Sequence, residues 1–440
     1  MTGPGCPAHA MSMKQADAFW NATAPDGPPP EVLEGPLACD VAIVGAGFTG
    51  LRAALALAEA GTDVAVFEAQ DVANGASGRS GGQVNPMLPV ARPDDLRKAV
   101  GPAYFEKLAA VALGSADDLF DLVRRYQIEC EARQHGWLRA NHCEAARRVA
   151  ERNALLWNKM GATFDFVGRE DVTRMTGAVG YASGVITPSG GAIQPLALTR
   201  GLARVARGAG ARIFSHAPVS ALDQKDGFWH LRVKDHKVTA RQVIIATNGY
   251  TDNLLRGLKR SVLPLTSIQI ATDPLDDDRL GPLCPEGHTI SDTRRLIMYC
   301  RREPGGQFIY GGMGYRTPAG GIGGFQWLYK DAPKIFPSLA GVKWRYEWGG
   351  SVALTQDRVP HLHEPAPGLL AGLGYNGRGV AMSLQMGRVM AERALGKPMA
   401  DLPFPPAPIK PYRFREPQVL GAGLAMSLLR LKDQREARLG

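Results

Sequence analysis

The stretch Asp40-Val-Ala-Ile-Val-Gly-Ala-Gly-Phe-Thr-Gly50 decides the fold that the sequence predicts. Its apolar, β-branched start is typical of a buried parallel strand. Residues 45–50 have the spacing G-x-G-x-x-G, and the Ala/Leu-rich run 51–60 predicts a helix that Gly61 ends. A second strand is expected over residues 62–67. This order predicts the first βαβ unit of a dinucleotide-binding sheet.

Each glycine in a dinucleotide-binding turn has a steric role, and the glycines of this sequence stand at the positions that need them. Gly45 permits the tight turn, Gly47 lets a pyrophosphate approach the backbone, and Gly50 lets helix and strand pack closely. Helix N–H groups then face the phosphates. Glu68 follows Gly50 by 68 − 50 = 18 positions, which suits hydrogen bonds from an adenosine ribose and favours FAD or NAD over NADP.

Two alternatives apply to this stretch: a glycine turn that binds nothing, and a transmembrane helix over residues 41–58. The complete strand-helix-strand-acid order argues against the first. Arg52 and three glycines at motif spacing argue against the second.

Composition sets the class of protein. A chain of 440 residues with 45% apolar and 21% charged residues is typical of a globular protein with two domains. The net charge of +9 is spread without a run of five basic residues, which argues against nucleic acid as a partner. The six cysteines have neither C-x-x-C nor zinc-ligand spacing, so we expect reduced thiols, no metal and a cytoplasmic location. No charged start followed by an apolar run indicates a secretory signal.

The rest of the chain divides by pattern. Residues 1–37 are an arm rich in Pro and Gly, and residues 71–83 form a loop of glycines and small hydroxyls, suited to lie against a flat ligand. Residues 93–161 predict core helices without a catalytic pattern. A helix over 196–207 and strands up to 242–246 resume the first sheet, and residues 262–346 predict an antiparallel sheet.

The C-terminal part repeats the glycine-turn pattern. The run Leu369-Leu-Ala-Gly-Leu373 is followed by Gly374-Tyr-Asn-Gly-Arg-Gly379 and a predicted helix from Val380 to about Leu395. The final segment, 419–435, spaces four leucines on one helical face: Leu420, Leu424, Leu428 and Leu431.

These motifs resemble those of the glycine oxidase/D-amino-acid oxidase superfamily of FAD enzymes. The sequence is most similar to the γ-glutamylputrescine oxidoreductase-like branch, through the Ala22-Thr-Ala-Pro arm, the Ser77-Gly-Arg-Ser-Gly-Gly-Gln83 loop and the Thr355-Gln-Asp-Arg-Val-Pro360 segment. The resemblance implies an α/β fold, with a Rossmann-like FAD-binding domain interleaved with an α+β substrate domain that contains the antiparallel sheet. The expected bounds are an arm at 1–37, the FAD-binding domain at 38–90, 165–250 and 345–400, the substrate domain at 91–164 and 251–344, and a C-terminal extension at 401–440.

The resemblance also implies which residues bind FAD. Some relatives attach flavin through a cysteine in the segment matching 348–357, which has none here, so noncovalent FAD is expected. The helix after Gly379 supplies N–H groups where reduced flavin gathers negative charge. The cofactor-binding residues implied are Gly45, Gly47, Phe48, Thr49, Gly50, Glu68, Ala69, Ser77, Gly78, Arg79, Ser80, Gly81, Gly82, Gln83, Val219, Ala246, Thr247, Asn248, Gly249, Gly374, Asn376, Gly377, Arg378, Gly379 and Val380.

The implied reaction is oxidation of the C–N bond of an amine or amino acid by hydride transfer to flavin N5, giving an imine that hydrolyses. The protein must dock the substrate carbon and exclude water. Candidates to wall the site are Tyr250, Tyr299, Trp348 and Tyr375; each could equally pack in a core. Arg301, Arg302, Arg316 or Arg378 could pair a substrate carboxylate, or each could be a solvated surface charge. His361 and His363 could tune the flavin edge or be ordinary packing residues.

Three alternatives remain open at this point. The substrate could be a cyclic or secondary amino acid, such as pipecolate or a proline derivative. A tRNA-modifying flavoprotein is a different class, disfavoured by the modest charge. The leucine face of 419–435 could rest on a membrane and pass electrons to a quinone, although packing on its own domain is preferred. Oxygen and a quinone both fit as electron acceptor.

Overall fold

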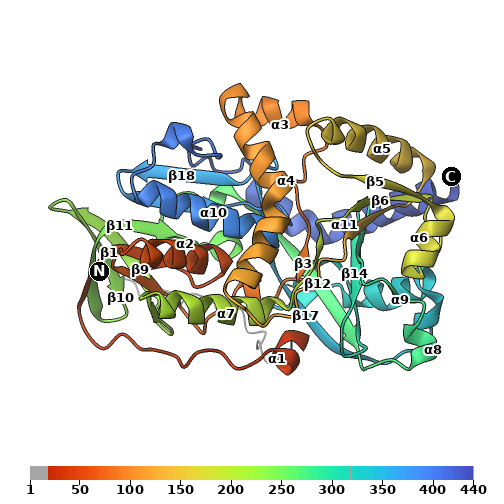
Figure 1. Cartoon of the computed structure of the whole chain (residues 1–440), viewed down its shortest axis with the longest axis horizontal. Helices are drawn as coiled ribbons and strands as arrows, with labels where there is room; N and C mark the ends of the chain where they lie inside the picture. Colours follow the sequence, from red (N-terminus) through yellow and green to blue (C-terminus); the bar gives the residue numbers. More distant parts are fainter. Residues whose placement is uncertain (1–17, 318, 440) are drawn as a thin grey trace.

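A computed structural model describes residues 18–317 and 319–439, which fold around two sheets (Figure 1). The first sheet has the strand order β18-β19-β11-β1-β2-β8, and β9 and β10 extend it as an antiparallel ribbon beside β11. Strands β19, β11, β1, β2 and β8 are parallel, as a Rossmann-like sheet requires. The bounds are β1 (Leu37–Val44), β2 (Val64–Phe67), β8 (Arg212–Phe214), β9 (Val219–Lys225), β10 (Phe228–Val233), β11 (His236–Ile245), β18 (His361–Ala366) and β19 (Leu369–Leu373).

Successive side chains of β1 point to opposite faces of the first sheet and pack in two different hydrophobic clusters. Val41 and Ile43 pack in the cluster formed with helices α2 (Phe48–Glu59), α4 (Pro102–Arg125), α7 (Pro195–Gly208) and α10 (Gly379–Ala394). Ala42 and Val44 pack in the cluster on the opposite face. Helix α2 begins at Phe48, inside the glycine motif as the sequence predicts, so its first turn opens directly from the glycines.

The second sheet has the order β17-β12-β15-β14-β13-β4-β6-β5 and is antiparallel except for the β13–β4 pair. The predicted antiparallel sheet is confirmed, but it recruits strands from outside the expected bounds. Strand β4 interrupts the region predicted as helices, and β5, β6 and β17 come from segments assigned to the FAD-binding domain. The bounds are β4 (Trp137–Asn141), β5 (Asp165–Gly168), β6 (Ser183–Thr187), β12 (Leu263–Thr272), β13 (Thr289–Asp292), β14 (Met298–Arg302), β15 (Phe308–Arg316), with β16 (Ile322–Gly323) beside it, and β17 (Trp344–Leu354).

The remaining elements are two long helices, α5 and α11, and several shorter elements. They comprise α1 (Phe19–Thr23), a 3₁₀ turn η2 (Ala76–Gly78), the pair β3 (Gln83–Val84) and β7 (Gly191–Ala192), α3 (Pro93–Val100), α5 (Glu144–Asn158), α6 (Arg169–Thr176), η3 (Asn248–Tyr250), η4 (Leu258–Ser261), α8 (Asp277–Leu280), α9 (Phe325–Ile335), η5 (Pro337–Leu339), η6 (Met399–Asp401) and α11 (Arg415–Leu439).

The described part of the N-terminal arm is anchored in the interior through α1. Phe19 and Trp20 are buried, and the ring centroids of Trp20 and Trp348 lie 5.7 Å apart. Trp20 Nε1 donates a hydrogen bond to the Ser80 carbonyl at 2.8 Å. The arm therefore helps to hold the glycine-rich loop of residues 71–83 in place.

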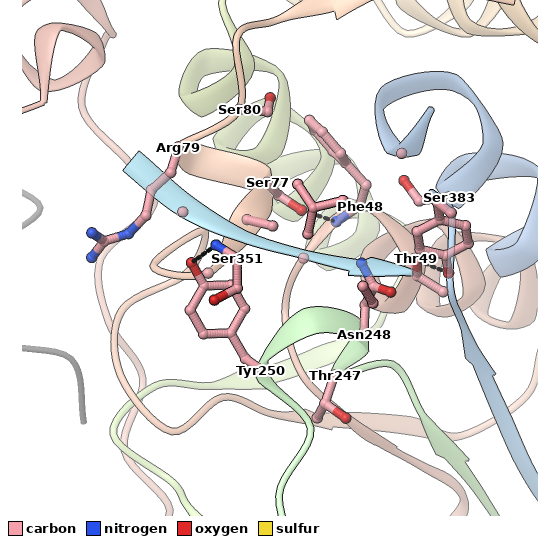
Figure 2. Close-up of a pocket in the computed structure, with 18 of the residues that line it drawn as sticks. Phe48, Thr49, Ser77, Arg79, Ser80, Thr247, Asn248, Tyr250, Ser351 and Ser383 are labelled. Carbon is pink, nitrogen blue, oxygen red and sulfur yellow. Dashed lines mark hydrogen bonds between the residues drawn. The ribbon is translucent and has the colours of Figure 1, made fainter. Parts of the chain in front are cut away.

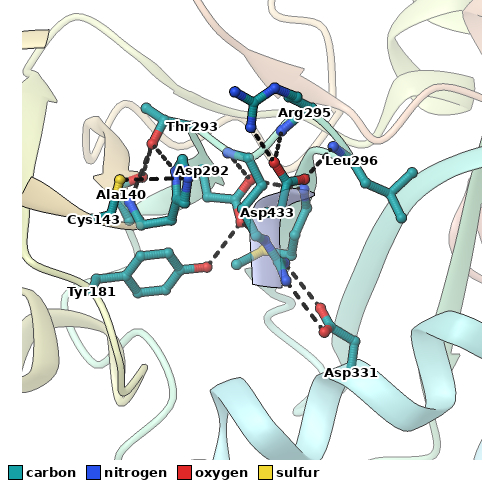
Figure 3. A network of polar contacts seen from close by, with 12 residues as sticks. Ala140, Cys143, Tyr181, Asp292, Thr293, Arg295, Leu296, Asp331 and Asp433 are labelled. Atoms are coloured by element: carbon teal, nitrogen blue, oxygen red, sulfur yellow. Dashed lines mark hydrogen bonds and ion pairs between the residues drawn. The ribbon is translucent and has the colours of Figure 1, made fainter. Parts of the chain in front are cut away.

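The C-terminal helix α11 is tied to the turn that joins β13 and β14 (Figure 3). The Asp433 carboxylate accepts hydrogen bonds from the backbone N–H groups of Arg295 and Leu296, at 3.2 and 3.0 Å. Glu436 pairs with the Arg295 guanidinium at 2.7 Å, and these hydrogen bonds lower the pKa of Glu436 to about 2. Hydrogen bonds and an ion pair therefore hold α11 against the connection between β13 and β14.

The expected packing of the leucine face on its own domain is wrong for the two leucines whose side chains are described. Leu428 and Leu431 are each 63% exposed, whereas Met426 is buried against the second sheet. The side chains of Leu420 and Leu424 lie outside the described residues. None of the helices in the described part of the chain combines the length and apolar character needed to cross a membrane.

Candidate active site

A cavity of about 610 Å³ lies where the two sheets meet, within the range of roughly 300–1,000 Å³ usual for organic ligands. The C-terminal ends of β1, β2 and β11 and the starts of α2 and α10 form one side of it (Figure 2). Residues of β12, β13, β14 and β17 form the other side. The parallel sheet therefore binds ligand at the edge where such folds place it.

The first glycine turn fits a dinucleotide because it leaves no room for side chains. Gly45 has φ +104°, and a Cβ on Gly47 would lie 2.8 Å from Ser77 Oγ. A Cβ on Gly50 would lie 2.0 Å from the Gly45 carbonyl oxygen. No side chain caps Gly47 at the start of α2, and the Phe48 N–H donates to Ser77 Oγ at 2.9 Å. The helix start is open toward the cavity, as phosphate binding requires.

Glu68 is held beside this turn by the backbone. Its Oε2 accepts the Ala46 N–H at 2.9 Å and its Oε1 accepts the Gln70 N–H at 3.1 Å. Burial raises its pKa, against these hydrogen bonds. Glu68, Ala69 and Val219 line the same end of the cavity, where the sequence predicts the adenosine.

The second glycine turn lines the same cavity as the first. Gly377 has φ +84° and Asn376 has φ +52°, and the Asn376 amide oxygen accepts the Thr355 N–H at 2.9 Å. Tyr375 Oη lies 2.7 Å from Thr49 Oγ1, which joins the starts of α10 and α2. A ligand here meets two helix N-termini, each with positive potential.

The loop with Ser77 and Gln83 bridges the two sheets. The Gln83 amide donates to the carbonyls of Ile290 and Cys300 at 3.0 and 2.8 Å. Gly82 has φ +63°, and a Cβ there would lie 2.3 Å from the Ile193 carbonyl oxygen. The backbone of this loop is therefore fixed along the cavity.

One row of side chains across the second sheet forms the opposite wall. Ser291 of β13 is in register with Tyr299 of β14, which is in register with Gly311 of β15. A Cβ on Gly311 would lie 2.3 Å from the Tyr299 ring, so the ring lies over the glycine. Tyr299 Oη lies 2.6 Å from Ser267 Oγ and donates to the Ile268 carbonyl at 3.1 Å. Burial raises the pKa of Tyr299, so its hydroxyl stays protonated and acts as a donor.

Most of the predicted residues line this cavity. Of the aromatic candidates, Tyr250, Tyr299 and Tyr375 do, and Tyr250 Oη accepts the Ser351 N–H at 3.2 Å. Gly50, Gly78, Gly249 and Gly374 belong to the turns at its edge but do not line it. The cofactor candidates that line it are Gly45, Gly47, Phe48, Thr49, Glu68, Ala69, Ser77, Arg79, Ser80, Gly81, Gly82, Gln83, Val219, Ala246, Thr247, Asn248, Asn376, Gly377, Arg378, Gly379 and Val380.

The structure corrects the predicted roles of Arg301 and Trp348 as site residues. The buried Arg301 guanidinium pairs with both carboxylate oxygens of Glu303 and donates to the carbonyls of Gly82 and Ile193, both at 2.8 Å. It clamps the glycine loop, so it cannot pair with a substrate carboxylate. Trp348 is buried in the cluster with Trp20 and lies outside the cavity lining.

The other arginine and histidine candidates also lie off the cavity, except Arg378. Arg302 donates to the Leu280 carbonyl at 3.5 Å, and Arg316 donates to Ser351 Oγ at 2.9 Å. His361 contacts Asp357 at 3.0 Å, and the buried His363 contacts the Ala407 carbonyl at 2.6 Å. None of these four lines the cavity.

Sequence reasoning identified Tyr299 of the opposite wall but missed the other side chains there. Ser267 and Ser291 line the cavity, and β4 adds Trp137 and Arg139 on the same sheet face. The signal for β4 was the alternation Gly136-Trp-Leu-Arg-Ala140, hidden between two long helical patterns. Ser267 and Ser291 lie on different strands, so no regular spacing in the sequence marks them as neighbours.

A parallel sheet with a glycine turn at its first crossover, joined to a second sheet across one cavity, defines a dinucleotide-dependent oxidoreductase. Residues 40–393 match the model of the DAO family, described as FAD dependent oxidoreductase. The chain belongs to this family.

Named relatives agree with this assignment. The chain is 30% identical over 406 residues to the gamma-glutamylputrescine oxidoreductase of Escherichia coli, covering 90% of this chain and 94% of that protein. It is 30% identical over 382 residues to the probable oxidoreductase OrdL of Rhizobium meliloti, covering 86% and 88%. The crystal structure of glycine oxidase from Geobacillus kaustophilus superposes with a TM-score of 0.70 at 21% identity, covering 86% and 99%. The chain is therefore an FAD-dependent oxidoreductase that acts on amines or amino acids.

Proposed function

We propose that this enzyme oxidises a γ-glutamylated amine of the γ-glutamylputrescine type at a C–N bond, with FAD bound noncovalently. The similarity to the Escherichia coli enzyme, at 30% identity over 94% of its length, is the observation that carries this proposal. The cavity is consistent with it, because a cofactor end built from backbone groups is joined to a wall of hydroxyls.

Bound FAD supplies a hydride acceptor for the carbon next to the substrate nitrogen. The chain itself positions the substrate, because Tyr250 and Tyr299 close the sides and the fixed backbone of 80–83 sets the depth at which a substrate stops. Of the described lining residues, the only carboxylates are Glu68, committed to backbone N–H groups, and Asp252, which is exposed. The wall offers no strong base, so the amine must lose its proton to solvent before it docks.

The cofactor assignment and the domain division are part of the same proposal. The lining residues of the two glycine turns and of 77–83 bind FAD, and the strands of the first sheet form its domain. The second sheet forms the substrate domain. The described cysteines, Cys39, Cys130, Cys143, Cys284 and Cys300, are absent from the cavity lining, which supports noncovalent binding. Acid precipitation should leave a yellow supernatant; a yellow pellet contradicts it.

Anaerobic mixing of the purified yellow protein with candidate substrates tests the substrate class. γ-Glutamylputrescine should bleach the flavin absorption faster, at equal concentration, than putrescine, glycine, proline or pipecolate. Faster bleaching by proline or pipecolate would move the assignment to cyclic amino acids. Absence of bleaching with all five would refute amine oxidation of this type. Readmission of oxygen then separates an oxidase from a dehydrogenase.

A further inference from the structure

Two arginines flank one tryptophan at the edge of the cavity. Trp137 and Arg139 lie two positions apart on β4, so their side chains share one face of the second sheet. Arg378, at the start of α10, places its Cζ 4.3 Å from the centroid of the Trp137 ring. Arg139 Cζ lies 6.0 Å from the same ring. The ring is a rigid plate that holds two guanidinium groups near each other.

This cluster adjoins the wall that faces the cofactor end, and of its three residues only Arg378 lines the cavity. Arg139 is in register with Ser291 on the neighbouring strand, and Ser291 is in register with Tyr299. The Trp137 indole N–H donates to Ser291 Oγ at 2.9 Å. Ser291, Tyr299 and Arg378 all line the cavity. A molecule lying over Tyr299 can therefore reach the arginines two strands away, about 10 Å across the sheet.

The two guanidinium groups lack compensation within the described chain. By comparison, Arg301 is paired with Glu303, and Arg294 is paired with Asp292 and Asp331. By contrast, no described carboxylate forms an ion pair with Arg139 or Arg378, and the buried Arg139 Nε has no hydrogen-bond partner. Burial lowers the pKa of both groups, that of Arg378 to about 9, with the charge of Arg139 adding to the effect.

Such an arrangement is unfavourable for folding alone. A buried cation without a partner costs several kcal/mol in proteins, and two of like sign repel. An anion bound by both guanidinium groups would offset the cost of burying each charge and the repulsion between them. It could accept several hydrogen bonds, because each planar guanidinium presents parallel N–H donors. The cost is explained if a ligand supplies the missing charge.

We propose that Arg139 and Arg378 bind a carboxylate of the substrate, with Trp137 holding both guanidinium groups in place. This inference rests on the proposed function and refines it: the substrate carries an amine over the flavin end and a carboxylate at the β4 end. A γ-glutamyl group has such a carboxylate, whereas putrescine itself has none. Arg378 belongs to the glycine turn and Arg139 to the second sheet, so the carboxylate also bridges the two sheets.

Titration of the FAD-loaded enzyme with butyrate and with butyramide tests the site, because the two probes share shape and differ in charge. Binding is measured by calorimetry and by the shift of the flavin absorption. Butyrate should bind the natural enzyme, and Arg139→Met and Arg378→Met should each weaken it at least tenfold. Arg139→Lys should retain part of the affinity. Butyramide should bind all variants alike.

Arg302→Met is the matched control, because Arg302 also lies on a strand of the second sheet but donates to the Leu280 carbonyl, at 3.5 Å, and has no contact with Trp137 or Arg378 among the described interactions. It should leave both probes unaffected. Unchanged butyrate affinity in both methionine variants, or no butyrate binding to the natural enzyme, overturns the site. Loss of FAD from the variants with butyrate affinity retained in the fraction that keeps FAD would also overturn it, since the arginines would then serve the cofactor.

Failure of this inference can be told from failure of the proposed function. If γ-glutamylputrescine bleaches the flavin equally well in the natural enzyme and both methionine variants, the function stands and the carboxylate site falls. If butyrate binding depends on the arginines but no amine bleaches the flavin, the site stands and the function falls.

Discussion

The two ends of the cavity are built in opposite ways. The cofactor end is organised around one continuous stretch, Val41 to Glu68, to which residues 77–83 and a second glycine turn are added. Its glycines keep the backbone exposed, because a Cβ on Gly47 or Gly82 would collide with neighbouring atoms. The substrate end comes from strands spread between Trp137 and Leu354, and it presents the side chains of Ser267, Ser291 and Tyr299. The proposed arginine pair joins the two ends, because Arg139 lies on β4 and Arg378 belongs to the second glycine turn. Backbone recognition demands glycine at fixed spacing, whereas side-chain recognition leaves the spacing free. One end can therefore keep its form while the other changes with the substrate.

The largest expected effect comes from Gly50→Ala. Its Cβ would lie 2.0 Å from the Gly45 carbonyl oxygen, and backbone cannot give way there as a flexible side chain could. The protein should purify colourless, as measured by the ratio of visible to ultraviolet absorption. Gly114→Ala, in the middle of α4 with open space around it, is the control and should stay yellow. A fully flavinated Gly50→Ala would refute the backbone account of this end.

Glu68→Leu should have the next largest effect. It leaves the N–H groups of Ala46 and Gln70 without their acceptor, which costs about 1–3 kcal/mol for each buried group. The Kd for FAD should therefore rise by about tenfold or more, measured by fluorescence titration of the apoprotein. Glu68→Gln keeps one acceptor and should lose less. Equal Kd values for all three proteins would show that the carboxylate does not organise the turn.

The pH dependence of butyrate binding tests whether the substrate end recognises charge through Arg378. Arg378 carries its charge below a pKa of about 9, with Arg139 as its charged neighbour among the described residues. Butyrate affinity should thus be constant from pH 7 to about 8.5 and fall above pH 9, by up to roughly tenfold per pH unit. Butyramide affinity, measured in parallel by calorimetry, should not follow it. A flat butyrate profile to about pH 10.5, well past that pKa, would show that Arg378 does not contribute its charge.

The smallest effect is expected for Ser267→Ala. It removes the 2.6 Å contact that orients the Tyr299 hydroxyl, while the Ile268 carbonyl still accepts from that hydroxyl. A lost hydrogen bond of this kind costs about 1 kcal/mol, so kcat/KM should fall about fivefold. The FAD content should not change. A loss of FAD instead would mean that the wall supports the cofactor rather than the substrate.

These differences explain what sequence reasoning could reach. The β1-α2-β2 unit was predictable because the strand, Gly45, Gly47, Gly50 and the acid at position 68 are local and each is required sterically. The resemblance then placed the second turn at Gly374 to Gly379, and both turns do line one cavity.

The substrate wall was not predictable from local pattern. Arg301 looked available in the sequence, yet its Nε and Nη2 donate to Glu303 and its Nη1 donates to the carbonyls of Gly82 and Ile193. Arg139 lay in a region that predicted only helices, because the five-residue strand β4 stands between the long α4 and α5. Partners of this kind are set by strand register across the sheet, which periodicity does not encode.

The salt-bridged docking of α11 has a consequence for selectivity. Asp433 holds the N–H groups at residues 295 and 296, in the short connection between the strands that carry Ser291 and Tyr299. A displacement of that connection would shift both hydroxyl-bearing strands. Substrate preference should therefore respond to substitutions at Asp433, in a helix whose described residues do not line the cavity, and screens that alter only the cavity would overlook this position.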